Sequence, residues 1–139
     1  MNRRESREKA VQLLFQIDMT QNSVEDAMAH LIEEDNKPEV RDTSFLLELV
    51  EGTVAHQPEI DAVISKYLRG WTMARLANVD RAILRLAAYE MLHMEEIPIG
   101  VTLNEAVELA KLFGSDESPK FINGVLSSMA KERDRGNEQ

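Results

Sequence analysis

The chain of 139 residues carries a formal net charge of −9, is 43% hydrophobic and contains no cysteine. Its length fits one compact domain with a core large enough to fold without cross-links. The lack of cysteine excludes disulfides, thiolate catalysis and Cys-based zinc or iron–sulfur sites. We expect no signal peptide, because the start is charged from Arg3, and no membrane span, because no apolar run approaches ~20 residues. The cytoplasm is the expected compartment.

Apolar residues recur at spacings of three and four along most of the chain, which predicts an all-α fold of about seven helices. In the amino-terminal part, Ser23 with Asp26 resembles a capping box, and Asn36-Lys37-Pro38 ends the second helix. A short helical turn is expected before Asn78. The helices are expected over about residues 3–19, 23–35, 39–56, 58–67, 79–94, 102–113 and 118–130.

Local signals also mark the last two helices. Thr102 and Glu105 form a capping-box pattern for the sixth helix, and Gly114 is a typical residue to stop it. Ser118-Pro119 predicts an N-cap followed by the first helical position of the seventh helix. The charged tail from Lys131 is expected to fray.

The chain is expected to form a single domain spanning 1–139 with one shared core. A seam near residues 56–58 or 70–72 would divide it into a three-helix amino half and a four-helix carboxyl half, with the subdomains taken as about 1–57 and 58–139.

Charge is unevenly distributed along the chain. Residues 1–12 carry four bases against two acids, a local +2, and residues 62–91 carry five bases against two acids, a local +3. Residues 20–61 hold eleven acids against two bases, about −9, and residues 92–139 return to −4. Any RNA would therefore meet two basic segments and avoid the acidic remainder, which a basic partner protein could cover.

Sequence patterns for catalysis are weak. The six glycines are dispersed, so neither a dinucleotide-binding fingerprint nor a P-loop is present. No histidine has a nucleophile at an interpretable spacing. Glu90-x-x-His93 has the spacing of di-metal helix bundles, but such a site needs a second copy. We expect no metal site, with Glu90 pairing with a nearby arginine or capping a backbone group and His93 exposed near a helix end.

Three places in the sequence are candidates for RNA contact. Arg3, Arg4 and Arg7 lie at spacings that place them on a shared helix face, where guanidinium groups can bind phosphate, or they simply solvate a helix end. Trp71, between Arg69 and Arg75, is either a stacking platform or, as is commoner for a lone tryptophan, part of the core. Lys120, Phe121 and Asn123 follow a proline at a helix start and offer charge, stacking and hydrogen bonding.

Most of the chain resembles the NusB family of bacterial antitermination factors. Residues 20–75 match that family only in helical pattern. The blocks that carry the resemblance are Arg3-Arg4-x-x-Arg7-x-x-Ala10-Val11-Gln12-x-Leu14-Phe15, Asp80 to Glu90, Ile97-Pro98, Leu103 to Phe113 and Lys120 to Leu126. The chain has Phe15 where the family often has tyrosine and Ser127 where it often has an acidic residue.

The resemblance implies an all-α fold of two small packed helical bundles. It also implies an RNA-binding protein without catalysis or cofactor. Such a protein binds boxA-type single-stranded RNA together with NusE, also a small-subunit ribosomal protein, and helps a transcription elongation complex read through terminators, notably on ribosomal RNA operons. By motif position, the implied RNA-contacting residues are Arg3, Arg4, Arg7, Gln12, Phe15, Lys120, Phe121 and Asn123. The implied NusE-facing residues are Asp80, Arg81, Leu84 and Glu117.

Two alternatives belong to other classes. NusB-like domains also occur fused to ribosomal RNA methyltransferases, but this chain is too short to include one and lacks a glycine-rich cofactor loop. The second alternative is a helical self-association module, because some family members resemble homodimers that would bury the arginine-rich face.

Overall fold

A computed structural model describes residues 1–34 and 42–137, apart from the side chains of residues 32, 34 and 134–137. Within these residues the chain forms seven α-helices, one short 3₁₀ helix and no strand, so the all-α prediction is confirmed. The elements are α1 (Arg3–Thr20), α2 (Val24–Glu34), α3 (Ser44–Ala55), α4 (Gln57–Ser65), η1 (Met73–Arg75), α5 (Asn78–His93), α6 (Ile99–Phe113) and α7 (Ser118–Asn137). None of the described helices is long and apolar enough to cross a membrane.

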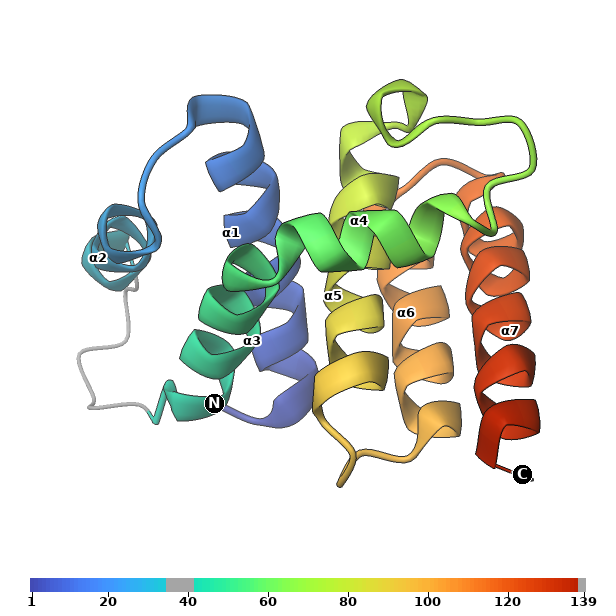
Figure 1. Cartoon of the computed structure of the whole chain (residues 1–139). Coiled ribbons are helices and arrows are strands. Elements are labelled where there is room, and N and C mark those ends of the chain that lie inside the picture. The colour runs from blue at the N-terminus through green and yellow to red at the C-terminus, as the bar shows by residue number, and fades with distance from the viewer. Residues whose placement is uncertain (35–41, 138–139) are drawn as a thin grey trace.

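Helices α1, α5, α6 and α7 stand side by side, and α4 crosses in front of α5 (Figure 1). Helix α3 packs against both α1 and α5, and α2 lies at the edge beside α1 and α3. Helix α5 therefore contacts α1, α3, α4, α6 and α7. The predicted division into subdomains near residue 57 falls where α3 and α4 meet, and it stays a prediction.

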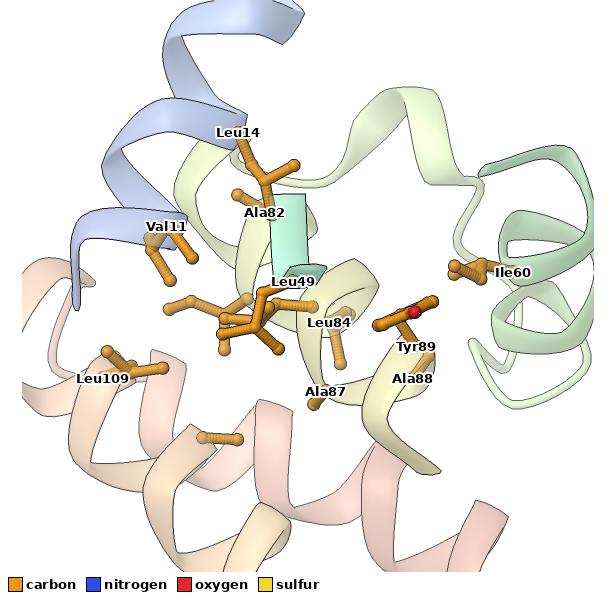
Figure 2. Close-up of a cluster of buried hydrophobic side chains, with 14 of the residues drawn as sticks. Val11, Leu14, Leu49, Ile60, Ala82, Leu84, Ala87, Ala88, Tyr89 and Leu109 are labelled. Carbon is orange, nitrogen blue, oxygen red and sulfur yellow. The ribbon is translucent and has the colours of Figure 1, made fainter. Parts of the chain in front are cut away.

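The central position of α5 follows from its composition. Its side chains are buried without interruption from Ala82 to Met91, as expected for a helix whose apolar residues surround its axis. Figure 2 shows Leu84 and Tyr89 of α5 packed among Leu49 of α3, Ile60 of α4 and side chains of α1 and α6. Two buried residues of α5, Arg85 and Glu90, are charged, and both pair with residues of other helices.

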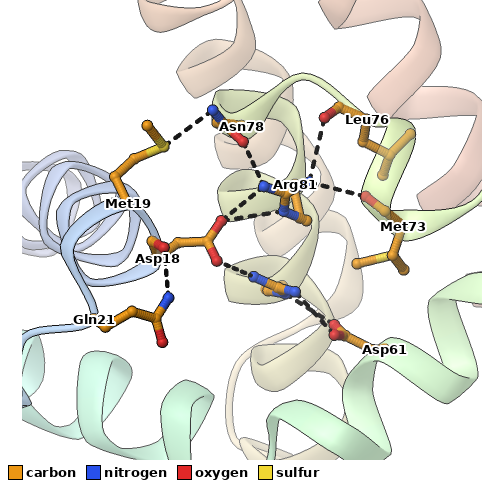
Figure 3. Close-up of polar contacts among 9 residues, drawn as sticks. Asp18, Met19, Gln21, Asp61, Met73, Leu76, Asn78 and Arg81 are labelled. Carbon is orange, nitrogen blue, oxygen red and sulfur yellow. Dashed lines mark hydrogen bonds and ion pairs between the residues drawn. The ribbon is translucent and has the colours of Figure 1, made fainter.

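A network of ion pairs ties α5 to α1 and α4. The Asp18 carboxylate of α1 accepts hydrogen bonds of 2.8 and 3.2 Å from the Arg81 guanidinium (Figure 3). The same carboxylate lies 3.5 Å from the Arg85 guanidinium. Arg85 also donates two 2.9 Å hydrogen bonds to Asp61 of α4. These partly buried, multidentate pairs help to orient the three helices.

The amino-terminal boundaries agree with the sequence in part. The Ser23 hydroxyl accepts a 3.1 Å hydrogen bond from the Asp26 backbone N–H, as the capping pattern predicts. Helix α3 begins at Ser44 rather than near residue 39, and the Asp42 carboxylate accepts hydrogen bonds from the Ser44 N–H and hydroxyl. The predicted helix end at 36–38 and the first residues of the predicted third helix, 39–41, lie outside the described residues.

The predicted capping box of the sixth helix is wrong. Helix α6 begins one turn earlier, at Ile99, with Pro98 in the N-cap position. Thr102 is buried inside the helix and donates a 3.2 Å hydrogen bond to Glu90, while Glu105 pairs with Arg4. Both side chains of the Thr-x-x-Glu pattern therefore bond to other helices. A local sequence pattern cannot predict such contacts.

The final helix also differs from expectation at both ends. Ser118 is its first residue rather than its N-cap, and the Ser118 hydroxyl accepts a 3.0 Å hydrogen bond from the Ser115 N–H in the preceding turn. Gly114 does end α6, as predicted. Helix α7 continues to Asn137 instead of fraying from Lys131.

Candidate nucleic-acid interface

The first turn of α1 presents two exposed arginines. Asn2 caps the helix by accepting a 2.7 Å hydrogen bond from the Glu5 N–H. The Arg3 guanidinium lies over the ring of Phe45, 4.4 Å from its centroid, which holds the cation at the surface beside α3. The Arg4 side chain is 66% exposed and pairs with Glu105 of α6 at 3.0 Å. An exposed pair of this kind is weak, so a phosphate can compete for Arg4.

Arg7 does not join them on the surface. It is only 3% exposed, and its guanidinium donates hydrogen bonds of 2.7 and 3.0 Å to the two carboxylate oxygens of Glu90. The predicted shared exposed face of Arg3, Arg4 and Arg7 is therefore wrong for Arg7, which is occupied inside the fold. Glu90 pairs with an arginine and His93 lies exposed at the end of α5, as expected.

Further along α1, Gln12 and Phe15 are exposed, as their predicted role in contacting RNA requires. Phe15 is 36% exposed and Met19, one turn later, is 56% exposed. Together with Arg4 these side chains place polar and apolar groups along the outer side of the helix, while Val11 and Leu14 enter the core.

A groove of about 910 Å³ lies between α7 and the segment that joins α4 to α5. The predicted residues Lys120 and Phe121 line it from the start of α7, with Lys120 exposed and Phe121 half-buried. Asn123 is exposed on the next turn and accepts a hydrogen bond from the Ser127 hydroxyl at 3.4 Å.

The opposite side of the groove is only partly predictable from the sequence. Arg69 and Arg75 line it together with Trp71, which is 57% exposed, so the interpretation of Trp71 as a core residue is wrong. Arg69 and Gly70 both adopt positive φ, +46° and +91°, and this turn carries Trp71 away from the core. An aromatic residue between two arginines is the signal in the sequence that points to this surface.

Tyr67 also lines the groove, and its hydroxyl donates a hydrogen bond to Glu132 of α7. Burial, followed by the Glu132 carboxylate, raises the pKa of Tyr67 to about 12. Tyr67 thus stays protonated at neutral pH and adds a neutral aromatic surface to a groove lined by four basic side chains, Arg69, Arg75, Lys120 and Lys131.

The four residues predicted to face a partner protein separate into two groups. Asp80 and Glu117 line the groove, and Asp80 Oδ1 is buried and accepts no hydrogen bond within the described part of the chain. Arg81 is engaged inside the fold by Asp18 and by the Met73 carbonyl (Figure 3). Leu84 is fully buried, so its predicted place on a partner-facing surface is wrong.

Fold and site together define a small all-α protein with a groove of basic and aromatic side chains, the composition of a single-stranded nucleic-acid interface. The family model described as the NusB family matches residues 4–131. The transcription antitermination protein NusB of Bacillus subtilis is 51% identical over 93% of this chain and 95% of its own length, and that of Lysinibacillus sphaericus is 47% identical over 95% and 99%. The chain belongs to the NusB family, the family of these transcription antitermination proteins.

Comparison with solved structures also finds members of the NusB family. T. maritima NusB superposes with a TM-score of 0.86 at 36% identity, covering 95% of this chain and 92% of the other. A structure of the antitermination factors NusB and NusE in complex with double-stranded RNA contains a chain that matches with a TM-score of 0.84 at 29% identity, covering 94% and 96%.

Proposed function

We propose that this chain is an antitermination factor that binds boxA-type single-stranded RNA together with NusE. Acting in the cytoplasm within a transcription elongation complex, it promotes read-through of terminators, notably on ribosomal RNA operons. The observation that carries the proposal is the groove between α7 and the α4–α5 connection, where Lys120 and Phe121 face Arg69, Trp71 and Arg75. The relative solved with NusE and RNA supports the choice of partners.

In this proposal the groove holds the RNA by charge and stacking. Arg69, Arg75 and Lys120 contact phosphates, and Phe121 and Trp71 offer faces on which unpaired bases stack. Stacking of this kind is worth about 1–3 kcal/mol per base. Arg3 and Arg4 at the start of α1 supply further exposed cations.

Charge explains the need for a partner. The chain carries a net charge of −9, so its surface outside the basic groove repels RNA. Asp80 and Glu117, which line the same groove, are suited to a basic protein surface. NusE bound there would neutralise these carboxylates and extend the RNA-binding surface, so RNA and NusE are expected to bind cooperatively.

The test is fluorescence anisotropy of a short labelled boxA RNA, titrated with the chain alone and then with NusE present. A scrambled RNA of the same length and composition is the control. We expect tighter binding with NusE, and loss of that gain on scrambling. Absence of binding at low salt under both conditions would reject the proposal.

Self-association is a second candidate, favoured by the exposed Phe15 and Met19 on α1. A homodimer that covers this side of α1 would bury both side chains beside the exposed arginines. Light scattering after size exclusion, with and without RNA, distinguishes self-association from RNA binding. A dimer that RNA converts to a monomer places self-association in the free state only.

A further inference from the structure

Two histidines and a glutamate meet where the α3–α4 junction contacts the end of α5. Glu59 lies between the imidazoles of His56 and His93. Its Oε2 is 3.5 Å from His56 Nδ1 and its Oε1 is 3.3 Å from His93 Nε2. The three ligand atoms all lie within 4.8 Å of one another. None of these residues belongs to the groove described above.

The fold holds the three side chains in place. His56 is the single residue between α3 and α4, and Pro58 in the first turn of α4 sets the helix that presents Glu59 three residues after His56. His93 is the last residue of α5. The two imidazole rings stack with centroids 4.1 Å apart.

Tyr89 forms the wall behind this pair of rings. Its ring centroid lies 5.4 Å from that of His93 and 6.0 Å from that of His56. Its burial, followed by the charges of Glu48 and Glu96, raises the pKa of Tyr89. The surroundings of the two histidines thus combine an aromatic wall with a negative electrostatic field, which favours a bound cation.

We propose that His56, Glu59 and His93 form a binding site for a divalent transition-metal ion, with Zn²⁺ the best match. Imidazole is a ligand for Zn²⁺, Cu²⁺ and Ni²⁺, and two histidines with one carboxylate are an established zinc donor set. Ligand bonds of 2.0–2.2 Å in a tetrahedron place neighbouring donor atoms about 3.3 Å apart. The two imidazole nitrogens lie 3.5 and 3.3 Å from different oxygens of Glu59, and the three ligand atoms lie within 4.8 Å of one another. Binding one ion therefore requires the stacked rings to turn so that both in-plane lone pairs meet at a single point. The fourth position, on the exposed side, is open to water.

The bound ion has a mechanical consequence. It would join the α3–α4 junction to the end of α5, which are otherwise held here by ring stacking and by ion pairs that require a protonated histidine. Protons compete with the metal for the imidazole nitrogens, so binding weakens as the pH falls. Since only the folded chain brings residues 56, 59 and 93 together, the metal stabilises the fold.

The test is isothermal titration calorimetry of the metal-free full chain with Zn²⁺, paired with thermal unfolding with and without Zn²⁺. We expect one ion per chain and a rise of a few degrees in Tm. His93→Ala and Glu59→Gln should each weaken binding by at least about tenfold, because loss of a group that merely supports a metal ligand already costs 10–100-fold. His30→Ala, which alters the remaining histidine of the chain on α2, is the matched control.

His93 and Glu59 are exposed, so both variants are expected to fold, and circular dichroism of the metal-free proteins verifies this. His93→Gln keeps a side chain of similar size if the alanine variant unfolds. The proposal is overturned if the wild-type chain shows no saturable binding. It is equally overturned if His93→Ala and Glu59→Gln bind Zn²⁺ like the wild-type chain, because the ion would then lie elsewhere.

Discussion

The buried guanidinium of Arg7 and the buried carboxylate of Glu90 form a two-pronged ion pair between α1 and α5. Both side chains are at least 96% buried, and the Thr102 hydroxyl of α6 donates a further hydrogen bond to the same carboxylate. Three helices thus meet at one charged cluster inside a predominantly apolar core. Removing one member leaves the other charge without a partner in a medium that solvates it poorly.

Arg7→Ala is therefore expected to destabilise the fold by about 3–5 kcal/mol, the cost of an uncompensated buried charge. Chemical denaturation measures it. Arg4→Ala is the matched control from the same helical turn, and its exposed pair with Glu105 predicts a loss of no more than about 1 kcal/mol. Equal losses in the two variants would show that the Arg7–Glu90 pair is not buried in solution.

The apolar double variant Arg7→Met with Glu90→Leu provides a second check. Replacing both charges with side chains of similar size removes the unpaired group, so the double variant should be more stable than Arg7→Ala. It also separates stability from RNA contact, because loss of RNA binding in Arg7→Ala but not in the double variant would come from unfolding.

The helices could be predicted because the apolar spacing repeats over many residues, and α1 and α5 begin and end within a residue or two of expectation. The inward direction of Arg7 could not be predicted. Its partner lies 83 residues further along the chain, and the spacing within α1 is equally compatible with an exposed face. The misplaced capping box at Thr102 has the same cause, since its hydroxyl and Glu105 bond to distant helices.

Gly52→Ala is expected to destabilise the fold by about 1–3 kcal/mol. A Cβ at this position of α3 would overlap the ring of Tyr89, so the ring or the helix must shift. Thermal unfolding measures the change. Gly100→Ala is the control, because a Cβ there meets nothing within 4 Å and alanine favours a helix by roughly 0.5–1 kcal/mol. A Gly52→Ala variant as stable as Gly100→Ala would contradict the close approach of α3 to Tyr89.

The raised pKa of Tyr67 predicts that the stability of the fold depends on pH in the alkaline range. Its pKa is raised from 10.0 to about 12, chiefly by burial and then by Glu132. Because the folded chain holds the phenol proton more tightly than the unfolded chain, this contribution to stability is fully present below pH 10 and is lost as the pH rises toward 12. Ultraviolet titration of the wild-type chain should show a late ionisation near pH 12 that the Tyr67→Phe variant lacks. A wild-type tyrosinate signal complete near pH 10 would contradict the burial of both tyrosines.

Only one side of the groove could be predicted, the side lined by residues that are adjacent in the sequence. Lys120 and Phe121 are adjacent in sequence, and a proline before them marks a helix start. The core is the commoner place for a lone tryptophan such as Trp71, and the positive φ values of Arg69 and Gly70, which turn it outward, cannot be read from composition. The start of α7 and the α4–α5 connection face each other because α5 packs against both α4 and α7.

The two residues at the start of α7 should affect RNA binding in different ways. Lys120→Ala removes a cation, so it should weaken RNA binding and reduce the slope of log affinity against log salt by about 0.7 for each phosphate that Lys120 neutralises. Phe121→Leu keeps much of the apolar packing but removes the aromatic face, so it should lower affinity by about 1–3 kcal/mol at an unchanged slope. Anisotropy titrations in the presence of NusE, repeated at several salt concentrations, distinguish the two effects.

Lys111→Ala is the control for that pair, since Lys111 is an exposed lysine of α6 that pairs with Glu108 and does not line the groove. Its removal changes the net charge by the same amount as Lys120→Ala. A long-range effect of charge alone would therefore shift both variants equally. A slope that falls for Lys120→Ala and not for Lys111→Ala places a phosphate at the groove, whereas equal slopes would leave Lys120 outside the RNA interface.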